Sequence, residues 1–139
     1  MSIVRRAAKT DLDQLFALVQ DLAASFEPEI DAFAQSLAHL IVQEDALLVV
    51  ADESGRLLGY LLGFDHRSLF ANGRVSWIEE IMVREDCRRR GHGRDLTVQF
   101  ELWARSRGSK LVALATRRAA PFYRALGYEE SAAYFRKLL

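Results

Sequence analysis

Hydrophobic residues in the first third of the chain recur at intervals of three or four positions. This spacing predicts amphipathic helices that each bury one face. A first helix is expected from Thr10 or Asp11, either of which can cap it, to about Phe26. Pro28 interrupts the chain, and a second helix is expected over about residues 31–43.

Later segments carry the continuous apolar runs that are typical of strands. The expected strands cover residues 3–6, 46–51, 57–64, 77–83 and 111–115. The second and third form an antiparallel hairpin around a turn at residues 52–55, and the polar residues 65–73 predict a loop before the fourth. Gly59 and Gly63 interrupt the third strand, which indicates bulges or the close approach of another group.

The last third predicts a crossover between parallel strands. A helix over residues 91–107 ends at Gly108 and leads to the strand at 111–115, which is apolar enough to be buried. A short helix follows over residues 119–126, and residues 128–139 are expected to return as one or two strands. The fold class is therefore α/β (α+β), with a mixed, mostly antiparallel sheet between helices, in one domain spanning residues 1–139.

Composition narrows the class of protein. The 139 residues are 50% hydrophobic, and Lys plus Arg balance Asp plus Glu at 19 each, so a general nucleic-acid binder is disfavoured. Cys87 is the only cysteine, which excludes an intrachain disulfide. The sequence shows no signal-peptide pattern, no apolar run that could cross a membrane and no metal-ligand spacing, so we expect a cytoplasmic protein without a metal.

The stretch from Trp77 to Arg94 reads as a strand, a basic turn and the start of a helix. Gly91 and Gly93 leave the backbone bare where the helix begins, and the N–H groups of a first helical turn attract phosphate. Arginines at positions 84, 88, 89, 90 and 94 surround them and can bind phosphate oxygens. The residues themselves therefore predict a pocket for a phosphorylated ligand.

Arg88-x-x-Gly91-x-Gly93 also resembles the acyl-CoA signature of the GNAT superfamily (Gcn5-related N-acetyltransferases). The residues 81–83 occupy the place of that family's usual Leu-x-Val at the end of its fourth strand. A second stretch, residues 116–128, resembles the family's Asn-x-x-Ala-x-x-Phe-Tyr signature and its following Gly-Tyr. Thr116 stands where asparagine is usual and offers fewer hydrogen-bonding groups.

The resemblance implies an N-acetyltransferase that moves an acetyl group from acetyl-CoA to a primary amine of a small molecule or a peptide by direct attack. Its fourth and fifth strands would be parallel and splayed to admit the coenzyme. The residues expected to bind acetyl-CoA are Ile81, Met82, Val83, Arg88, Arg89, Arg90, Gly91, His92, Gly93, Arg94, Thr116 and Phe122. Tyr123 would donate a proton to the departing thiolate, and Glu80 or Glu79, on opposite faces of the strand, would accept the amine's proton through water.

Several alternatives stay open. A non-catalytic acyl-CoA sensor on the same fold is the main rival, and a dinucleotide-binding fold is weaker because the third glycine is missing. The early helices and the loop at 65–73 are expected to line the acceptor pocket, where Phe26, Glu27 and Glu29 could face a cationic amine. His92 is expected to be exposed at the helix start, and an apolar strand at 132–139 could pair two subunits into a homodimer.

Overall fold

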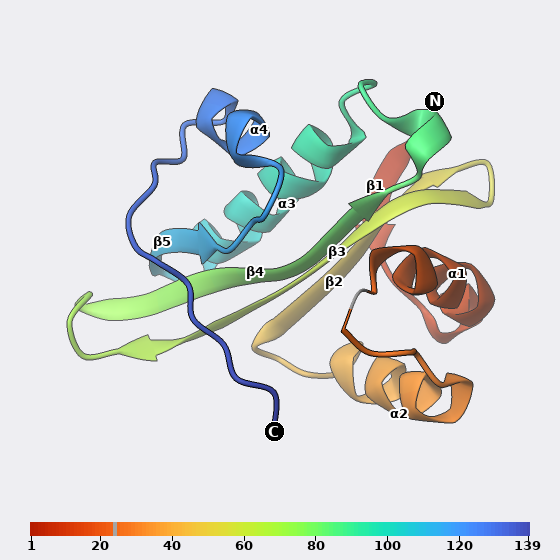
Figure 1. The fold of residues 1–139 in the computed structure, drawn as a ribbon, viewed down its shortest axis with the longest axis horizontal. Helices are drawn as coiled ribbons and strands as arrows, with labels where there is room; N and C mark the ends of the chain where they lie inside the picture. The colour runs from red at the N-terminus through yellow and green to blue at the C-terminus, as the bar shows by residue number, and fades with distance from the viewer. Residues whose placement is uncertain (24) are drawn as a thin grey trace.

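A five-stranded mixed sheet forms the centre of the computed structural model, which describes residues 1–23 and 25–139 (Figure 1). The strands lie in the order β1-β2-β3-β4-β5; neighbours from β1 to β4 are antiparallel, whereas β4 and β5 are parallel. The elements are β1 (Ile3–Arg6), η1 (Lys9–Asp11), α1 (Leu12–Leu22), α2 (Ile30–Leu40), β2 (Ala46–Glu53), β3 (Arg56–Ser68), β4 (Gly73–Val83), η2 (Glu85–Cys87), α3 (His92–Ser106), β5 (Ser109–Leu114) and α4 (Ala120–Ala125). The expected mixed sheet and its parallel last pair are confirmed.

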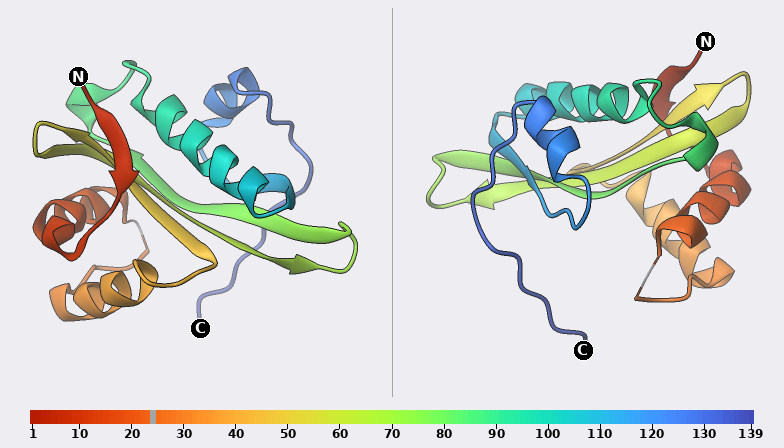
Figure 2. Two further views of the ribbon diagram at one scale, coloured as in Figure 1. Left: turned by 180° about the vertical axis from the view of Figure 1, so that it is seen from behind. Right: turned by 45° about the horizontal axis from the view of Figure 1, so that its top comes forward.

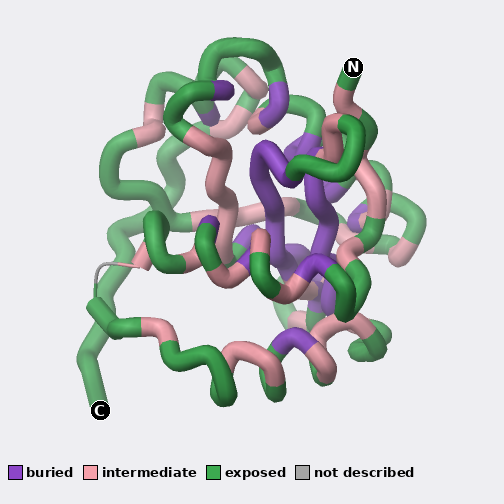
Figure 3. Tube along the Cα trace, turned by 90° about the vertical axis from the view of Figure 1, so that its right-hand side faces the viewer, coloured by how far each residue is buried: buried purple, intermediate pink, exposed green. Residues whose placement is uncertain are grey.

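Helices cover both faces of this sheet. Figure 2 shows α3 lying along one face and α1 with α2 packed on the opposite face. Leu96 and Phe100 of α3 are fully buried against the first face, and Leu15 and Leu18 of α1 are buried against the second. Burial is therefore concentrated in the middle strands, as Figure 3 shows, because only these are covered from both sides.

The β3–β4 hairpin is longer than the sequence predicted. Residues 65–68 belong to β3 and pair with residues 73–76 of β4, so the expected loop at 65–73 is confined to residues 69–72. The polar character of this segment has another cause, since Asp65 is buried and accepts hydrogen bonds from Arg74 of β4 and Arg107 at the end of α3. The hairpin thus anchors the C-terminal end of α3 through a buried carboxylate in addition to apolar contacts.

Gly59 and Gly63 do mark close approaches. A Cβ at Gly59 would lie 3.1 Å from the Cα of Val83, and one at Gly63 would lie 2.9 Å from the Trp77 carbonyl oxygen and would overlap the Phe100 ring. The β3–β4 register also shifts between Leu62 and Gly63. The strand needs glycine at both positions so that β4 and α3 can pack tightly on β3.

The C-terminal segment contradicts two expectations. Residues 128–139 form no strand, and residues 129–139 are exposed, although the Tyr134 ring stacks on Trp77 at 6.5 Å. Within the described residues no strand pairs with the outer edge of β5, and Leu111 is exposed rather than buried. An apolar pattern forms a strand only where a partner strand satisfies its backbone, and the tail lies apart from β5.

Candidate active site

The start of α3 exposes backbone N–H groups beside several arginines. Gly91 adopts a left-handed conformation with φ 86° at the N-cap, which favours glycine, and it has no side chain with which to cap the helix. The first-turn N–H groups therefore remain available to an anion. The side chains of Arg88, Arg89, Arg90 and Arg94 are exposed around this turn.

Arg84 does not belong to this cluster. Its Nε donates to the Leu57 carbonyl at 2.7 Å, and its backbone N–H donates to Leu58, so its guanidinium is tied to β3. The Nε of Arg88 donates to the Val83 carbonyl at 3.1 Å, which places this guanidinium at the end of β4. The basic turn thus splits into one structural arginine and four that can meet phosphate.

His92 is buried, so the expectation of an exposed side chain is wrong. Its Nδ1 lies 3.3 Å from the hydroxyl of Ser2, and its Nε2 has no hydrogen-bond partner among the described residues. The imidazole therefore turns toward the strand that follows Ser2, and only the backbone of His92 is placed to meet a ligand. Helical geometry decides this, because the first position of α3 faces the sheet.

Cys87 packs in the hydrophobic core on the α3 side of the sheet. It is 2% exposed, and burial raises the pKa of its thiol, with a hydrogen bond to Asp86 acting in the same direction. A thiol that resists ionisation is a poor nucleophile. Cys87 is therefore unsuited to act as a nucleophile.

The last residues of β4 extend beyond β5. β5 ends at Leu114, which pairs with Ile78, so residues 79–83 have no strand on that side within the described chain. Ile81 and Val83 pack toward α3, whereas Met82 packs toward α1 and α2. This stretch of free backbone edge can hydrogen-bond an extended ligand as a strand would.

A bulge in β4 separates the two candidate bases. Leu62 pairs with Glu80 and Gly63 pairs with Ile78, which leaves Glu79 without a partner on β3. Glu79 is exposed and accepts a hydrogen bond from the indole of Trp77 at 2.8 Å. Glu80 lies on the α1–α2 face instead, where the Tyr60 hydroxyl donates to it at 2.7 Å.

The two sequence motifs meet in space. A Cβ at Gly93 would lie 3.2 Å from the Phe122 ring and 3.9 Å from the Val83 side chain, so α3, α4 and the end of β4 touch at this point. Tyr123 follows on α4, with its ring 4.9 Å from that of Phe122, and burial raises its pKa. The phenol therefore keeps its proton at neutral pH.

Thr116 and Tyr128 support α4 from either side. The Thr116 hydroxyl accepts the N–H of Ala119 at 3.0 Å, which stabilises the turn before the helix. The Tyr128 hydroxyl donates to Glu101 of α3 at 2.7 Å, and its ring lies 5.7 Å from that of Tyr123. Both residues hold Tyr123 in position rather than adding a reactive group.

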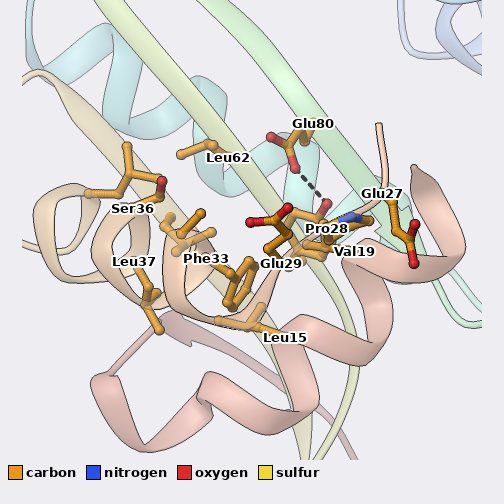
Figure 4. Close-up of a pocket in the computed structure, with 14 residues that line it drawn as sticks. Leu15, Val19, Glu27, Pro28, Glu29, Phe33, Ser36, Leu37, Leu62 and Glu80 are labelled. Carbon is orange, nitrogen blue, oxygen red and sulfur yellow. Dashed lines mark hydrogen bonds between the residues drawn. The ribbon is translucent and has the colours of Figure 1, made fainter. Parts of the chain in front are cut away.

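A cavity of about 350 Å³ lies on the opposite face of β4, between α1, α2 and the sheet. Tyr60 lines it together with Glu80, Glu27 and Glu29, and the three glutamates are labelled in the close-up in Figure 4. The early helices line this cavity, but no residue of 65–73 does, because that segment forms the distant hairpin. Tyr60 was not anticipated, since a tyrosine in an apolar strand carries no local mark of its hydrogen bond.

The described residues contain no group of His, Cys, Asp and Glu that could hold a metal ion. Within the same part of the chain, no helix is long and apolar enough to cross a membrane.

Comparison with known proteins identifies the fold. The chain superposes on an acetyltransferase from Trypanosoma brucei with a TM-score of 0.87, 22% identity and 100% of both chains covered. A glucosamine-6-phosphate N-acetyltransferase from Arabidopsis thaliana gives a TM-score of 0.89 at 17% identity, covering 99% of this chain and 98% of that one. The aminoglycoside N-acetyltransferase AAC(6')-Iy in complex with CoA gives 0.85 at 21%, covering 99% and 95%.

Such low identities show the shared fold alone, and no curated protein sequence matches the chain. The sequence model described as the Acetyltransferase (GNAT) family, however, matches residues 12–128, most of the chain. With the mixed sheet, the parallel β4–β5 pair and both motifs brought together at Gly93, the chain belongs to the GNAT family of acetyltransferases.

Proposed function

We propose that this protein transfers an acetyl group from acetyl-CoA to a primary amine by direct attack, without a covalent enzyme intermediate. One observation carries the proposal: the bare start of α3, the free edge of β4 and the Phe122–Tyr123 pair of α4 adjoin one another. Each suits a different part of acetyl-CoA, which has a diphosphate, a peptide-like arm and a thioester. A structural relative was solved in complex with CoA, which supports the same donor here.

The coenzyme would bind along two backbone surfaces. First-turn N–H groups of α3 at His92, Gly93 and Arg94 would hold the diphosphate, with Arg88, Arg89 and Arg90 screening its charge. Ile81, Met82 and Val83 would pair with the arm, and an N–H near Met82 or Val83 would polarise the thioester carbonyl. Phe122 and Thr116 would border the same space. An apolar side chain at Gly93 would narrow this approach, because its Cβ already meets Phe122.

Chemistry would take place across β4. The amine nitrogen attacks the thioester carbon from the cavity side, the carbon–sulfur bond breaks, and the sulfur leaves as a thiolate. Glu80 accepts the amine's proton through water, since it lines the cavity whereas Glu79 is exposed on the bulge. Tyr123 donates its proton to the sulfur, and its buried hydroxyl is protonated at neutral pH.

Thiol release tests the proposal. The protein is incubated with acetyl-CoA and a mixture of primary amines, and free CoA is measured together with the acetylated products. We expect amine-dependent release, and a fall in kcat on the order of 100-fold in Tyr123→Phe with unchanged acetyl-CoA affinity. Tyr134→Phe is the matched control, because Tyr134 is exposed on the tail. Full turnover in Tyr123→Phe would remove this tyrosine from the mechanism.

The pH–rate profiles of Glu80→Gln and Glu79→Gln assign the base. Glu80→Gln is expected to lose the acidic limb of the profile, and Glu79→Gln is expected to keep it. If both variants keep it, the base lies elsewhere. A non-catalytic sensor is the alternative function, and it predicts tight acetyl-CoA binding by calorimetry with no turnover for any amine.

A homodimer is part of the proposal. The outer edge of β5 has no strand beside it among the described residues, and the tail at 129–139 is exposed and extended. We expect the tail of one copy to pair with β5 of the other. Light scattering should give a dimer for the full chain and a monomer after removal of residues 130–139; a monomeric full chain at tens of micromolar contradicts the pairing.

A further inference from the structure

The cavity beside Glu80 has mostly apolar walls. Leu15 and Val19 come from α1, Phe33 and Leu37 from α2, and Leu48 and Leu62 from the sheet. The Phe33 ring is held by an edge-on contact with Phe16 at a centroid distance of 5.3 Å, so an aromatic surface faces the cavity. Apart from its glutamates, the polar lining residues are Ser36 and Tyr60, so a ligand here gains mainly from burying hydrocarbon.

Negative charge is confined to one side of this cavity. Glu29 and Glu80 come from different elements, and in Figure 4 the carboxylate of Glu27 points away from both. Tyr60 donates to one oxygen of Glu80, which leaves the other oxygen for a ligand. None of the described lining residues is Lys, Arg or His.

These features select the ligand by size, polarity and charge. A cavity of about 350 Å³ holds roughly a dozen water-sized groups. An ammonium group would meet Glu80 and Glu29, whereas a phosphate would meet only carboxylates. Sugar hydroxyls placed against the apolar walls would lose their hydrogen bonds to water without replacement, and each such loss weakens binding.

We propose that the acceptor is a monocationic primary amine with an apolar body, such as an arylalkylamine, rather than an amino sugar, a sugar phosphate or a polyamine antibiotic. This inference rests on the proposed function, and it adds the substrate class. The ammonium lies between Glu80 and Glu29, and the apolar body fills the space against Phe33 and Leu37. Loss of the proton near Glu80 then exposes the nitrogen lone pair to the thioester carbon on β4.

Steady-state kinetics with acetyl-CoA compare four acceptors. These are 2-phenylethylamine, hexylamine, glucosamine 6-phosphate and kanamycin. We expect kcat/KM for the two apolar amines to exceed the values for the two polar ones by at least about 50-fold, as the burial of one aromatic or alkyl group implies. A polar acceptor that is used as well as 2-phenylethylamine overturns the inference and leaves the proposed acetyltransferase activity intact.

A substitution that fills the cavity provides a sharper test. Ala32 lines the cavity on an exposed part of α2, so Ala32→Phe should fold and should lower kcat/KM for 2-phenylethylamine at least about tenfold, with little change for methylamine. Gln35→Phe is the matched control, because Gln35 is exposed on the same helix and outside the cavity. Equal effects of the two variants count against the cavity as the acceptor site.

The role of the Glu29 carboxylate is tested by a further pair of substitutions. Glu29→Gln should raise KM for 2-phenylethylamine about fivefold with little change in kcat, as expected for one exposed charge. Asp31→Asn, which alters a neighbouring exposed acid outside the cavity, should not raise it. An unchanged KM in Glu29→Gln removes this residue from the site.

Amine binding without acetyl-CoA distinguishes a failure of the proposed ligand class from a failure of the proposed function. Calorimetry with 2-phenylethylamine alone should detect binding to the parent protein and not to Ala32→Phe. If acetyl-CoA does not bind, the proposed function fails, yet amine binding of this kind would still support the ligand class of the cavity. If acetyl-CoA binds and 2-phenylethylamine neither binds nor accepts acetyl, the inference is overturned and the proposed function stands.

Discussion

Replacing Asp65 by asparagine tests how the far end of α3 is held to the sheet. The Asp65 side chain is fully buried, and one of its oxygens accepts hydrogen bonds from Arg74 at 2.9 Å and from Arg107 at 3.0 Å. Its other oxygen accepts from the Nε of Arg107. The carboxylate thereby joins β3, β4 and the C-terminal end of α3.

The structure supports a large effect on stability. Removing one partner of a buried ion pair costs about 3–5 kcal/mol, because it leaves the other charge uncompensated. The Arg74 and Arg107 side chains keep 22% and 20% of their surface in contact with water, so we take the lower end, about 3 kcal/mol. For a chain of this size that corresponds to a fall in Tm of roughly 10 °C.

The effect should depend on pH. Burial alone would raise the pKa of Asp65, but hydrogen bonds from Arg107 and Arg74 outweigh it and lower the pKa below its ordinary value. A carboxylate with a depressed folded-state pKa stabilises the fold above its unfolded pKa of about 3.9, and it loses this contribution as the pH falls through the folded value. The difference between parent and variant should therefore be constant from pH 5 to 8 and shrink below about pH 4.

Urea unfolding followed by tryptophan fluorescence measures both quantities. Trp103 is a suitable probe, because the Arg107 guanidinium lies 5.1 Å from the centroid of its ring. Asp86→Asn is the control: Asp86 pairs with Arg56 at 3.1 Å, but both side chains are more than half exposed, so its loss should lower the free energy of unfolding far less than the loss of Asp65. Equal unfolding free energies for Asp65→Asn and the parent at pH 7 would refute the reasoning, and so would a difference that persists undiminished at pH 2.

Three further predictions follow from close contacts. Gly93→Ala should change the free energy of unfolding by less than about 1 kcal/mol, because the Phe122 ring that the new methyl group approaches is 37% exposed and can shift. The same variant should bind acetyl-CoA about tenfold more weakly, and unchanged affinity in calorimetry would contradict the proposed diphosphate site. Gly63→Ala should destabilise the fold by about 3 kcal/mol in urea unfolding, because its Cβ overlaps the buried Phe100 ring, and a parent-like midpoint would show that this packing is looser than the structure indicates. Cys87 should react with a thiol reagent only after unfolding, and rapid labelling of the native protein would show that it is accessible.

Much of the fold could be predicted because it depends on local patterns. The apolar spacing of Leu15 and Val19 places one face of α1 on the sheet wherever that helix lies, and Gly55 with φ 91° forms the hairpin turn that its sequence context indicates. Element ends were less accurate. α1 ends at Leu22, where Ala23 is extended, and Phe26, which continues the helical spacing, is 75% exposed.

Errors occurred where the environment of a residue depends on distant partners. In the sequence Asp65 looks like a loop residue, but in the structure Arg74 and Arg107 donate hydrogen bonds to it. In the sequence Arg84 looks like one more phosphate ligand, but in the structure its Nε donates a hydrogen bond to the Leu57 carbonyl. The tail at 128–139 has a strand-like composition, but a strand also requires a neighbour with free backbone groups, and composition does not reveal where that neighbour lies.

The sequence alone determined the bare start of α3, since Gly91 and Gly93 dictate its backbone chemistry, and it determined the parallel β4–β5 pair, since a helix must join them. Only the tertiary structure decided which glutamate faces the cavity. The β4 bulge at Glu79 reverses the alternation of side chains by one residue, so Glu80 and Ile78 lie on opposite faces. A bulge arises from pairing with β3 and from the packing of α3 on Gly63, and neither is visible in the spacing of β4 itself.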